Sequence, residues 1–178
     1  MRYRNTPETY GLVSKILHWL IAVMVLGMLI VGVSFNYLPE NIVKMLMPIH
    51  KSTGVTLLGL MVLRLLWRLT NPVPRLPATM PRWQMITARA VHHLFYLLLI
   101  AMPITGVVMT LSGGHPLRFW SLGDIHLAFI PLDKSLSHLM FNWHDYLAWT
   151  IFALFVLHTA AALKHHFWDK DDVLRRML

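Results

Sequence analysis

Two histidines near the end of the chain have a spacing that suits a metal or redox site. His144 and His158 are fourteen residues apart, which in an α-helix places both side chains on one face, about 21 Å apart along the axis. No charged side chain occurs in residues 146–157. Imidazole is a common ligand of metals and of haem iron, and an ionisable residue in an apolar segment is costly unless it has a function. The pair therefore predicts one ligand near each end of a long apolar helix.

Two further histidines, His18 and His50, lie near the ends of two other apolar segments. If neighbouring segments cross a membrane in opposite directions, His18 reaches the depth of His158. In the same way, His50 reaches the depth of His144. Paired histidines at two depths are what two stacked b-type haems require. All four residues are therefore predicted to be ligands of haem iron, with two haem b groups as cofactors.

The composition indicates a membrane protein with a single domain, residues 1–178. Of its 178 residues, 56% are hydrophobic and only 13% are charged, which is typical of membrane proteins. The chain has no cysteine, which excludes disulfides, thiolate-ligated haem, iron–sulfur clusters and covalent haem attachment. The net charge is +8, but Lys and Arg flank the apolar runs and form no single basic face. A nucleic-acid partner is therefore not expected.

Four apolar segments approach the ~20 residues that cross a hydrocarbon core: residues 16–35, 48–69, 90–111 and 143–163. They predict an all-α membrane protein, a four-transmembrane-helix bundle that encloses two b haems. The first segment is too long for the apolar part of a cleavable signal peptide, so we expect it to be a retained anchor. Before the fourth segment, a short separate helix is expected at the membrane interface, near residues 134–140.

The distribution of basic residues predicts the orientation. Twelve of the 16 Lys and Arg residues lie before the first segment, from the last two turns of the second segment to the start of the third, or after the fourth. Because basic flanks remain on the cytoplasmic side, both termini of this multi-pass protein are expected in the cytoplasm. In this orientation His18 and His158 form the inner pair, and His50 and His144 form the outer pair.

Other polar residues near these histidines are candidate partners of haem and of quinone. Haem propionates are acidic, and three basic residues in the second segment are candidates to bind them: Lys51, Arg64 and Arg68. Quinone carbonyls accept hydrogen bonds, and candidate donors lie at the inner surface: Ser14, His165 and His166. The alternatives are that these residues only cap the bundle, or that quinone binds at the outer face beside His50 and His144.

Several motifs resemble those of the bacterial cytochrome b561 family, in an order that covers nearly the whole chain. They include residues 15–19 (Lys-Ile-Leu-His-Trp), 50–54 (His-Lys-Ser-Thr-Gly), 143–145 (Trp-His-Asp) and 157–158 (Leu-His). The resemblance implies a four-helix inner-membrane protein with two haems, whose axial ligands fall on the four histidines chosen by depth. It also implies electron exchange with the quinone pool, with ubiquinone as acceptor. One branch of the family oxidises superoxide at the outer face.

The predicted function is therefore transmembrane electron transfer, with superoxide:ubiquinone oxidoreductase as the expected reaction of that branch. A funnel for superoxide should be basic, whereas the outer segments carry four basic and four acidic residues. Lys51 and Arg118 would therefore have to attract superoxide locally. The alternative to superoxide is a periplasmic electron donor. Two other functions stay open: a haem b membrane-anchor subunit that serves a separate dehydrogenase, and a haem-free metal or proton transporter. His92 or His93 is an alternative inner ligand.

Overall fold

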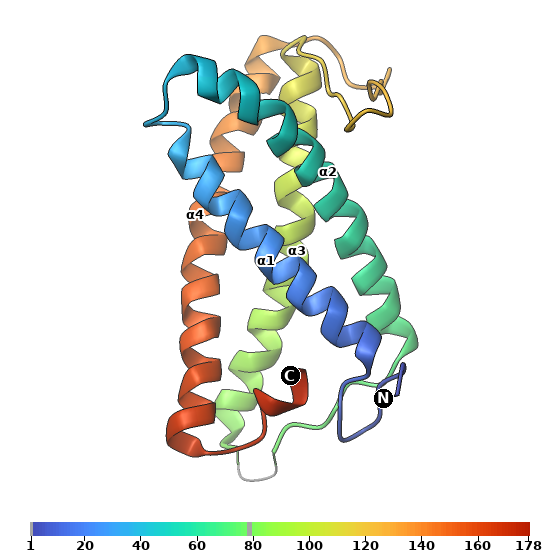
Figure 1. The fold of residues 1–178 in the computed structure, drawn as a ribbon, viewed down its shortest axis with the longest axis vertical. Helices are drawn as coiled ribbons and strands as arrows, with labels where there is room; N and C mark the ends of the chain where they lie inside the picture. Colours follow the sequence, from blue (N-terminus) through green and yellow to red (C-terminus); the bar gives the residue numbers. More distant parts are fainter. Residues whose placement is uncertain (1, 78–79) are drawn as a thin grey trace.

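Four long helices make up most of the protein in the computed structural model, which describes residues 2–77 and 80–178. They are α1 (Leu12–Ser34), α2 (Glu40–Thr70), α3 (Arg82–Ser112) and α4 (Lys134–Lys164) (Figure 1). Each is long and apolar enough to cross a membrane. Within the described residues there is no strand, only an isolated bridge between Arg118 and Asp124. The predicted all-α membrane fold with four spanning helices is confirmed.

Helix α4 begins earlier than its apolar segment because its first turn is capped. The Asp133 carboxylate accepts hydrogen bonds from the backbone N–H groups of Ser135 and Leu136, at 2.8 and 3.1 Å. These bonds satisfy two of the donors that a helix start leaves unpaired. The prediction of a separate interfacial helix at residues 134–140 is therefore wrong, since these residues form the first two turns of α4.

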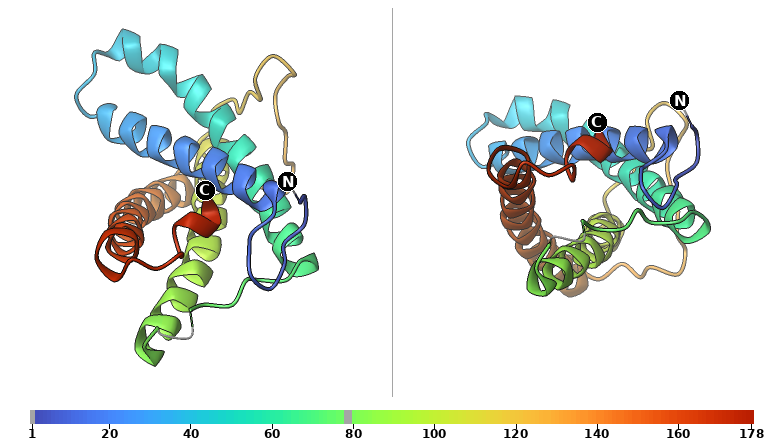
Figure 2. Two further views of the ribbon diagram at one scale, coloured as in Figure 1. Left: turned by 60° about the horizontal axis from the view of Figure 1, so that its bottom comes forward. Right: turned by 90° about the horizontal axis from the view of Figure 1, so that it is seen from below.

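The helices form two antiparallel hairpins, α1 with α2 and α3 with α4. Backbone packing is most extensive between α3 and α4, and it continues from α1 to α2 and from α2 to α3. Seen along the bundle, the four helices surround a common axis (Figure 2). Both chain termini lie at one end (Figure 1), which we call the terminal end. The opposite end, with residues 35–39 and 113–133, is the loop end.

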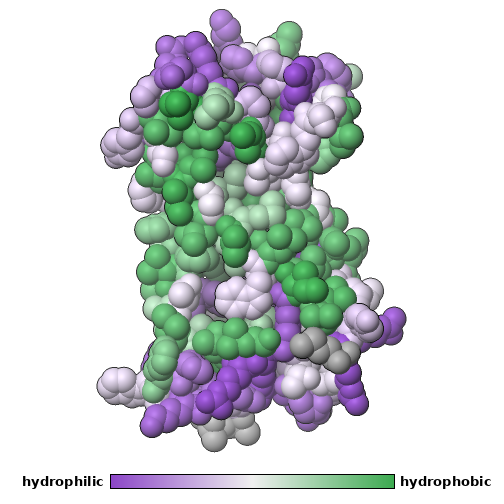
Figure 3. All heavy atoms as spheres, in the orientation of Figure 1, coloured by the Kyte–Doolittle hydropathy of each residue, from purple (hydrophilic) through white to green (hydrophobic). Residues whose placement is uncertain are grey.

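A small apolar core divides the bundle at mid-depth. Its buried residues come from all four helices: Ile21, Val25, Leu57, Met61, Leu98 and Ile151. Ile151 is only 1% exposed and lies seven residues from both His144 and His158, so it shares their helix face. Many other large apolar side chains are exposed, and the surface shows a hydrophobic band between two hydrophilic ends (Figure 3). Lipid covers such a band in a membrane protein.

At the loop end, residues 113–133 fold back onto α2. The buried Ser52 hydroxyl accepts from the Trp120 N–H and donates to the Arg118 carbonyl, each at 3.0 Å. The Trp120 indole N–H donates to Thr56 Oγ1 at 3.0 Å. Trp120 has a φ of 50°, which costs of order 1–3 kcal/mol for a residue with a side chain. These hydrogen bonds hold the loop in that conformation.

At the terminal end, the chain continues past α4 through a π-helical turn, η1 (His165–Asp169), and a short 3₁₀ helix, η2 (Arg175–Met177). The Trp19 indole N–H donates to the Met177 carbonyl at 2.8 Å, and Arg176 donates to the Arg75 carbonyl. The C-terminal segment thus reaches from α4 back to α1 (Figure 2).

Candidate functional site

The loop end holds one pair of histidines on facing helices. His50 of α2 and His144 of α4 have ring centroids 6.3 Å apart, with an interplanar angle of 69°. His144 Nδ1 lies 3.0 Å from the Met102 carbonyl oxygen and 3.1 Å from Thr105 Oγ1. Because a carbonyl oxygen only accepts, the proton of a neutral His144 sits on Nδ1. Its Nε2 then carries the lone pair that a metal needs.

Two glycines let these rings lie close to neighbouring helices. A Cβ added at Gly106 of α3 would lie 3.2 Å from His144 Cε1, and one at Gly32 of α1 would lie 3.9 Å from His50 Cε1. His50 Nδ1 is buried, and no described residue offers it a hydrogen-bond partner. A buried polar atom normally has a hydrogen-bond partner. The unpaired Nδ1 of His50 therefore indicates that the surroundings of this ring are completed by a bound ligand.

The terminal end holds a second pair of the same separation. His18 of α1 and His158 of α4 have ring centroids 6.3 Å apart, with an interplanar angle of 75°. A third histidine, His92 of α3, lies 5.7 Å from His158 between centroids, so the alternative inner ligand is also at this site. Phe95 packs edge-on against His158 at 5.4 Å.

The separation of both pairs fits a metal ion held between two imidazoles. Each metal–nitrogen bond is about 2 Å long, and each ring centroid lies about 1 Å beyond its nitrogen. Two imidazoles on opposite sides of one metal ion therefore have centroids about 6 Å apart. The structure thus brings together the two pairs that were chosen by depth, each at 6.3 Å. The donor set also suits haem b, because imidazole is its ordinary axial ligand.

Two arginines of α2 lie near the terminal pair. Arg64 Nη2 donates to His18 Nδ1 at 3.1 Å, and Arg64 Nε lies 3.4 Å from the Tyr96 hydroxyl. Arg68 lies over the Tyr96 ring, 5.6 Å from its centroid. No carboxylate of the described residues lies within 4.0 Å of either guanidinium group. Burial raises the pKa of the nearby Tyr10 phenol although both arginines oppose the shift, so Tyr10 does not neutralise them.

Lys51 contacts the loop after α3. Its Nζ donates to the Pro116 carbonyl at 3.3 Å, so Lys51 helps to hold residues 113–133 against α2. Arg118, in the same loop, forms an ion pair with Asp124 at 3.2 Å. Lys51 and Arg118 are therefore both engaged with protein atoms.

Two of the three candidate quinone donors at the terminal end already have protein partners. The Ser14 hydroxyl donates to Asn5 Oδ1 at 2.7 Å and accepts from the Trp67 indole N–H at 3.0 Å. His165 belongs to a separate network described below. Only His166 keeps a buried Nδ1 that is unpaired within the described part of the chain.

His165 lies in an ion-pair network that sequence reasoning missed. Its Nδ1 lies 2.6 Å from Asp171 Oδ2 and 3.1 Å from Asp169 Oδ2. Lys164 Nζ also binds Asp169, at 2.6 Å. The His–Asp spacing was readable in the sequence, because all these residues follow one another closely after α4. Each charged group in the network already has a partner, so the cluster acts as a cap on the end of α4.

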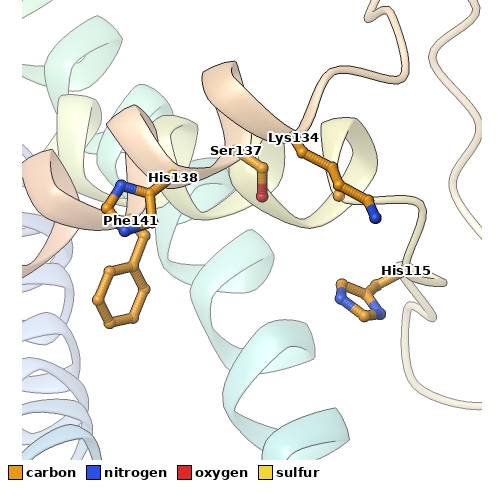
Figure 4. Close-up of a pocket in the computed structure, with 6 residues that line it drawn as sticks. His115, Lys134, Ser137, His138 and Phe141 are labelled. Carbon is orange, nitrogen blue, oxygen red and sulfur yellow. The ribbon is translucent and has the colours of Figure 1, made fainter.

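Sequence reasoning also missed a pocket of about 350 Å³ at the loop end (Figure 4). Its lining residues come from the start of α4 and from the loop after α3: Gly113, His115, Lys134, Ser137, His138 and Phe141. The sequence signal for this pocket was the helical spacing of residues 134, 137, 138 and 141. It was not recognised because residues 134–140 were assigned to a helix separate from the fourth segment.

A four-helix membrane bundle with two stacked pairs of histidines is the architecture of a membrane cytochrome b. The family described as prokaryotic cytochrome b561 matches residues 9–178. The chain is 37% identical to cytochrome b561 homolog 2 of Escherichia coli (strain K12), over 100% of this chain and 95% of that protein. It is 28% identical to cytochrome b561 homolog 1 of the same strain, over 72% of each chain. It is 29% identical to the probable superoxide oxidase CybB of Yersinia pestis, over 96% of each chain.

The chain therefore belongs to the prokaryotic cytochrome b561 family. It is a bacterial membrane protein of a family that transfers electrons and binds haem b. The alternative of a haem-free transporter does not fit this membership.

Proposed function

We propose that the protein transfers electrons across the bacterial inner membrane with two haem b groups. His50 and His144 hold one haem, and His18 and His158 hold the other. The observation that supports this most strongly is that both pairs have the 6.3 Å centroid separation of a metal held by two imidazoles. When bound, each haem supplies one-electron transfer without an open iron position for a substrate.

The protein's own residues orient the ligands and balance the charge. The Met102 carbonyl fixes the His144 ring through Nδ1, as outer hydrogen bonds commonly do for metal-bound histidines. Arg64 and Arg68 have no carboxylate partner in the described structure and are the proposed partners of haem propionates. His18 must then release Arg64, because a histidine that binds through Nε2 carries its proton on Nδ1. The apolar core around Ile151 excludes water between the two sites.

The orientation follows the basic residues. Both termini are proposed to face the cytoplasm, since twelve of the 16 Lys and Arg residues flank the terminal end of the helices. The His18–His158 pair is then the inner one, and the His50–His144 pair faces the periplasm.

We propose ubiquinone as the electron acceptor and superoxide as the donor. The reaction balances when two superoxide anions lose one electron each and become dioxygen, while one quinone takes up two electrons and two protons and becomes quinol. The similarity to the probable superoxide oxidase CybB over 96% of the chain supports this choice. A membrane-anchor subunit for a separate dehydrogenase is the second candidate, and the engagement of Lys51 and Arg118 with protein atoms favours it. Purified protein that reduces quinone with superoxide supports the first function. A co-purifying dehydrogenase, with no quinone reduction by superoxide, supports the second.

The test of the haem sites is a pair of single substitutions. His144→Ala should lose the loop-end haem and His158→Ala should lose the terminal-end haem, so each variant should retain one haem per chain. His126→Ala, in the exposed loop, is the matched control and should retain two. Haem content is measured from the pyridine haemochrome spectrum of the purified protein. Two haems per chain in either His144→Ala or His158→Ala would refute the ligand assignment.

A further inference from the structure

The Thr105 hydroxyl gives His144 a second hydrogen-bond acceptor at the loop end. Its oxygen lies 3.1 Å from His144 Nδ1 and donates to the Met102 carbonyl at 2.7 Å. Because that bond uses the only hydroxyl proton, Thr105 accepts from the Nδ1–H of His144. His144 Nδ1 also lies 3.0 Å from the Met102 carbonyl oxygen, so one N–H is shared between two acceptors. Acceptors at this position raise the basicity of a histidine as a metal ligand.

The terminal-end pair has a cation in the equivalent place. Arg64 Nη2 lies 3.1 Å from His18 Nδ1, and Arg64 is close enough to interact electrostatically with His158. Arg68 follows one turn later on α2, and both guanidinium groups lie over the Tyr96 ring, 6.0 and 5.6 Å from its centroid. Among the residues that the structure describes, no carboxylate lies within 4.0 Å of either group. The terminal end therefore has two positive charges that no carboxylate balances.

The loop-end pair has no such excess of positive charge. Lys51 follows His50 in the sequence, and Asp145 follows His144. Each of these charged groups interacts electrostatically with the histidine beside it. Because one group is a cation and the other an anion, their effects on an iron between the two histidines oppose each other.

These differences shift the reduction potentials of the two sites in opposite directions. A haem iron held by two imidazoles has one more positive charge when it is oxidised, so nearby cations favour the reduced form. Hydrogen-bond acceptors on a ligand N–H favour the oxidised form, because they increase the electron density of the ring. If Arg64 pairs with a propionate, it balances a negative charge, and its effect on the potential has the same sign.

We propose that these surroundings give the loop-end site a lower reduction potential than the terminal-end site. An electron then moves spontaneously inward along the bundle: the loop-end iron is oxidised from Fe(II) to Fe(III), and the terminal-end iron is reduced from Fe(III) to Fe(II). Thr105 is a positioning residue that acts through His144, and Arg64 acts through its charge. The potential difference rests on the proposed pair of haems, and it gives their electron transfer a direction.

The test is a spectroelectrochemical titration of the purified haem-loaded protein. The single-site variants assign the two midpoint potentials, because His158→Ala retains the loop-end haem and His144→Ala retains the terminal-end haem. His158→Ala should have the lower midpoint. We expect a difference of at least about tenfold in the equilibrium constant, which is about 59 mV for one electron. A unit charge at roughly 10 Å, with an effective dielectric constant of ~20, has an effect of this size.

Two substitutions in the protein with both haems test the two causes separately. Thr105→Val keeps the shape of the side chain but removes the acceptor, so it should raise the loop-end potential by about threefold in the equilibrium constant. Thr105→Ser should restore the wild-type value. Arg64→Gln should lower the terminal-end potential by about tenfold. Thr150→Val is the matched control, since the exposed Thr150 hydroxyl donates to the Tyr146 carbonyl of its own helix, and it should change neither potential.

Equal potentials, or a higher potential at the loop end, would overturn the proposed direction. A difference that neither Thr105→Val nor Arg64→Gln changes would overturn it as well, because these residues would not be its cause. In both cases the wild-type protein still holds two haems, so the proposed function stands. Fewer than two haems per chain in the fully loaded wild type would contradict the proposed function, and the potential difference with it.

Discussion

Replacement of Gly106 by alanine should weaken haem binding at the loop end while the bundle stays folded. The added Cβ would lie 3.2 Å from His144 Cε1 and 3.4 Å from Nδ1, which is closer than side chains normally approach. The ring is held by the Met102 carbonyl and lies beside Thr105, so it cannot move aside without cost. Overpacking of this kind costs about 1–3 kcal/mol, which corresponds to about 5- to 150-fold weaker haem binding.

The fold itself should tolerate the change, because alanine is favoured over glycine in a helix by about 1 kcal/mol. Gly59→Ala is the matched control, since a Cβ there meets no atom of the described residues within 4 Å. Haem-depleted protein is titrated with haem, and the absorbance change gives the affinity of each site. Gly106→Ala should show one weakened site and one normal site. Wild-type affinity in Gly106→Ala, or an equal loss in Gly59→Ala, would refute the close packing of Gly106 on a haem ligand.

Three further predictions concern the loop end and the orientation. Ser52→Ala removes the hydrogen-bond partner of the Trp120 N–H, so it should lower the free energy of unfolding by about 1–3 kcal/mol. It should also expose residues 113–133 to protease, and cleavage at the wild-type rate would contradict this. Asp133→Ala removes the cap of α4 and should cost about 1 kcal/mol, seen as a lower midpoint of thermal unfolding, whereas an unchanged midpoint would argue against the cap. A reporter active only in the periplasm should be silent after Leu178 and active within residues 113–133, and reversed signals would invert the proposed orientation.

The helices and the histidine pairs were predictable because few arrangements satisfy a membrane. An apolar segment of about 20 residues has to span as a helix, since its backbone groups find no other partners in lipid. The fourteen-residue spacing of His144 and His158 then defines two depths, and alternate crossing directions leave one partner for each. The observed contacts of His50 and His18 with these residues follow from this geometry.

The start of α4 was not recognised because polar residues interrupt its apolar pattern. Lys134 and His138 look like interfacial residues in the sequence, but they line a pocket in the structure. The capping signal of Asp133 was readable, because an Asp just before a helical segment commonly accepts from its first N–H groups.

The contacts between distant segments could not be predicted from local patterns. The hydrogen bond from Arg64 to His18 joins α2 to α1, and the proposed propionate role of Arg64 did not imply it. The hydrogen bond from Lys51 reaches the Pro116 carbonyl, 65 residues away in the chain. Docking of Trp120 on Ser52 joins residues 68 positions apart. Such pairings depend on how the whole loop packs, and no periodicity in the sequence reports it.

The most direct test of the central proposal is the reduced-minus-oxidised optical spectrum of the purified wild-type protein, together with its haem content per chain. The two histidine pairs predict a b-type α band and two haems per chain, since each pair has the 6.3 Å separation of a bis-imidazole site. One haem per chain in fully loaded protein would contradict the assignment of a haem to each pair. The absence of a b-type α band would contradict the haem assignment altogether.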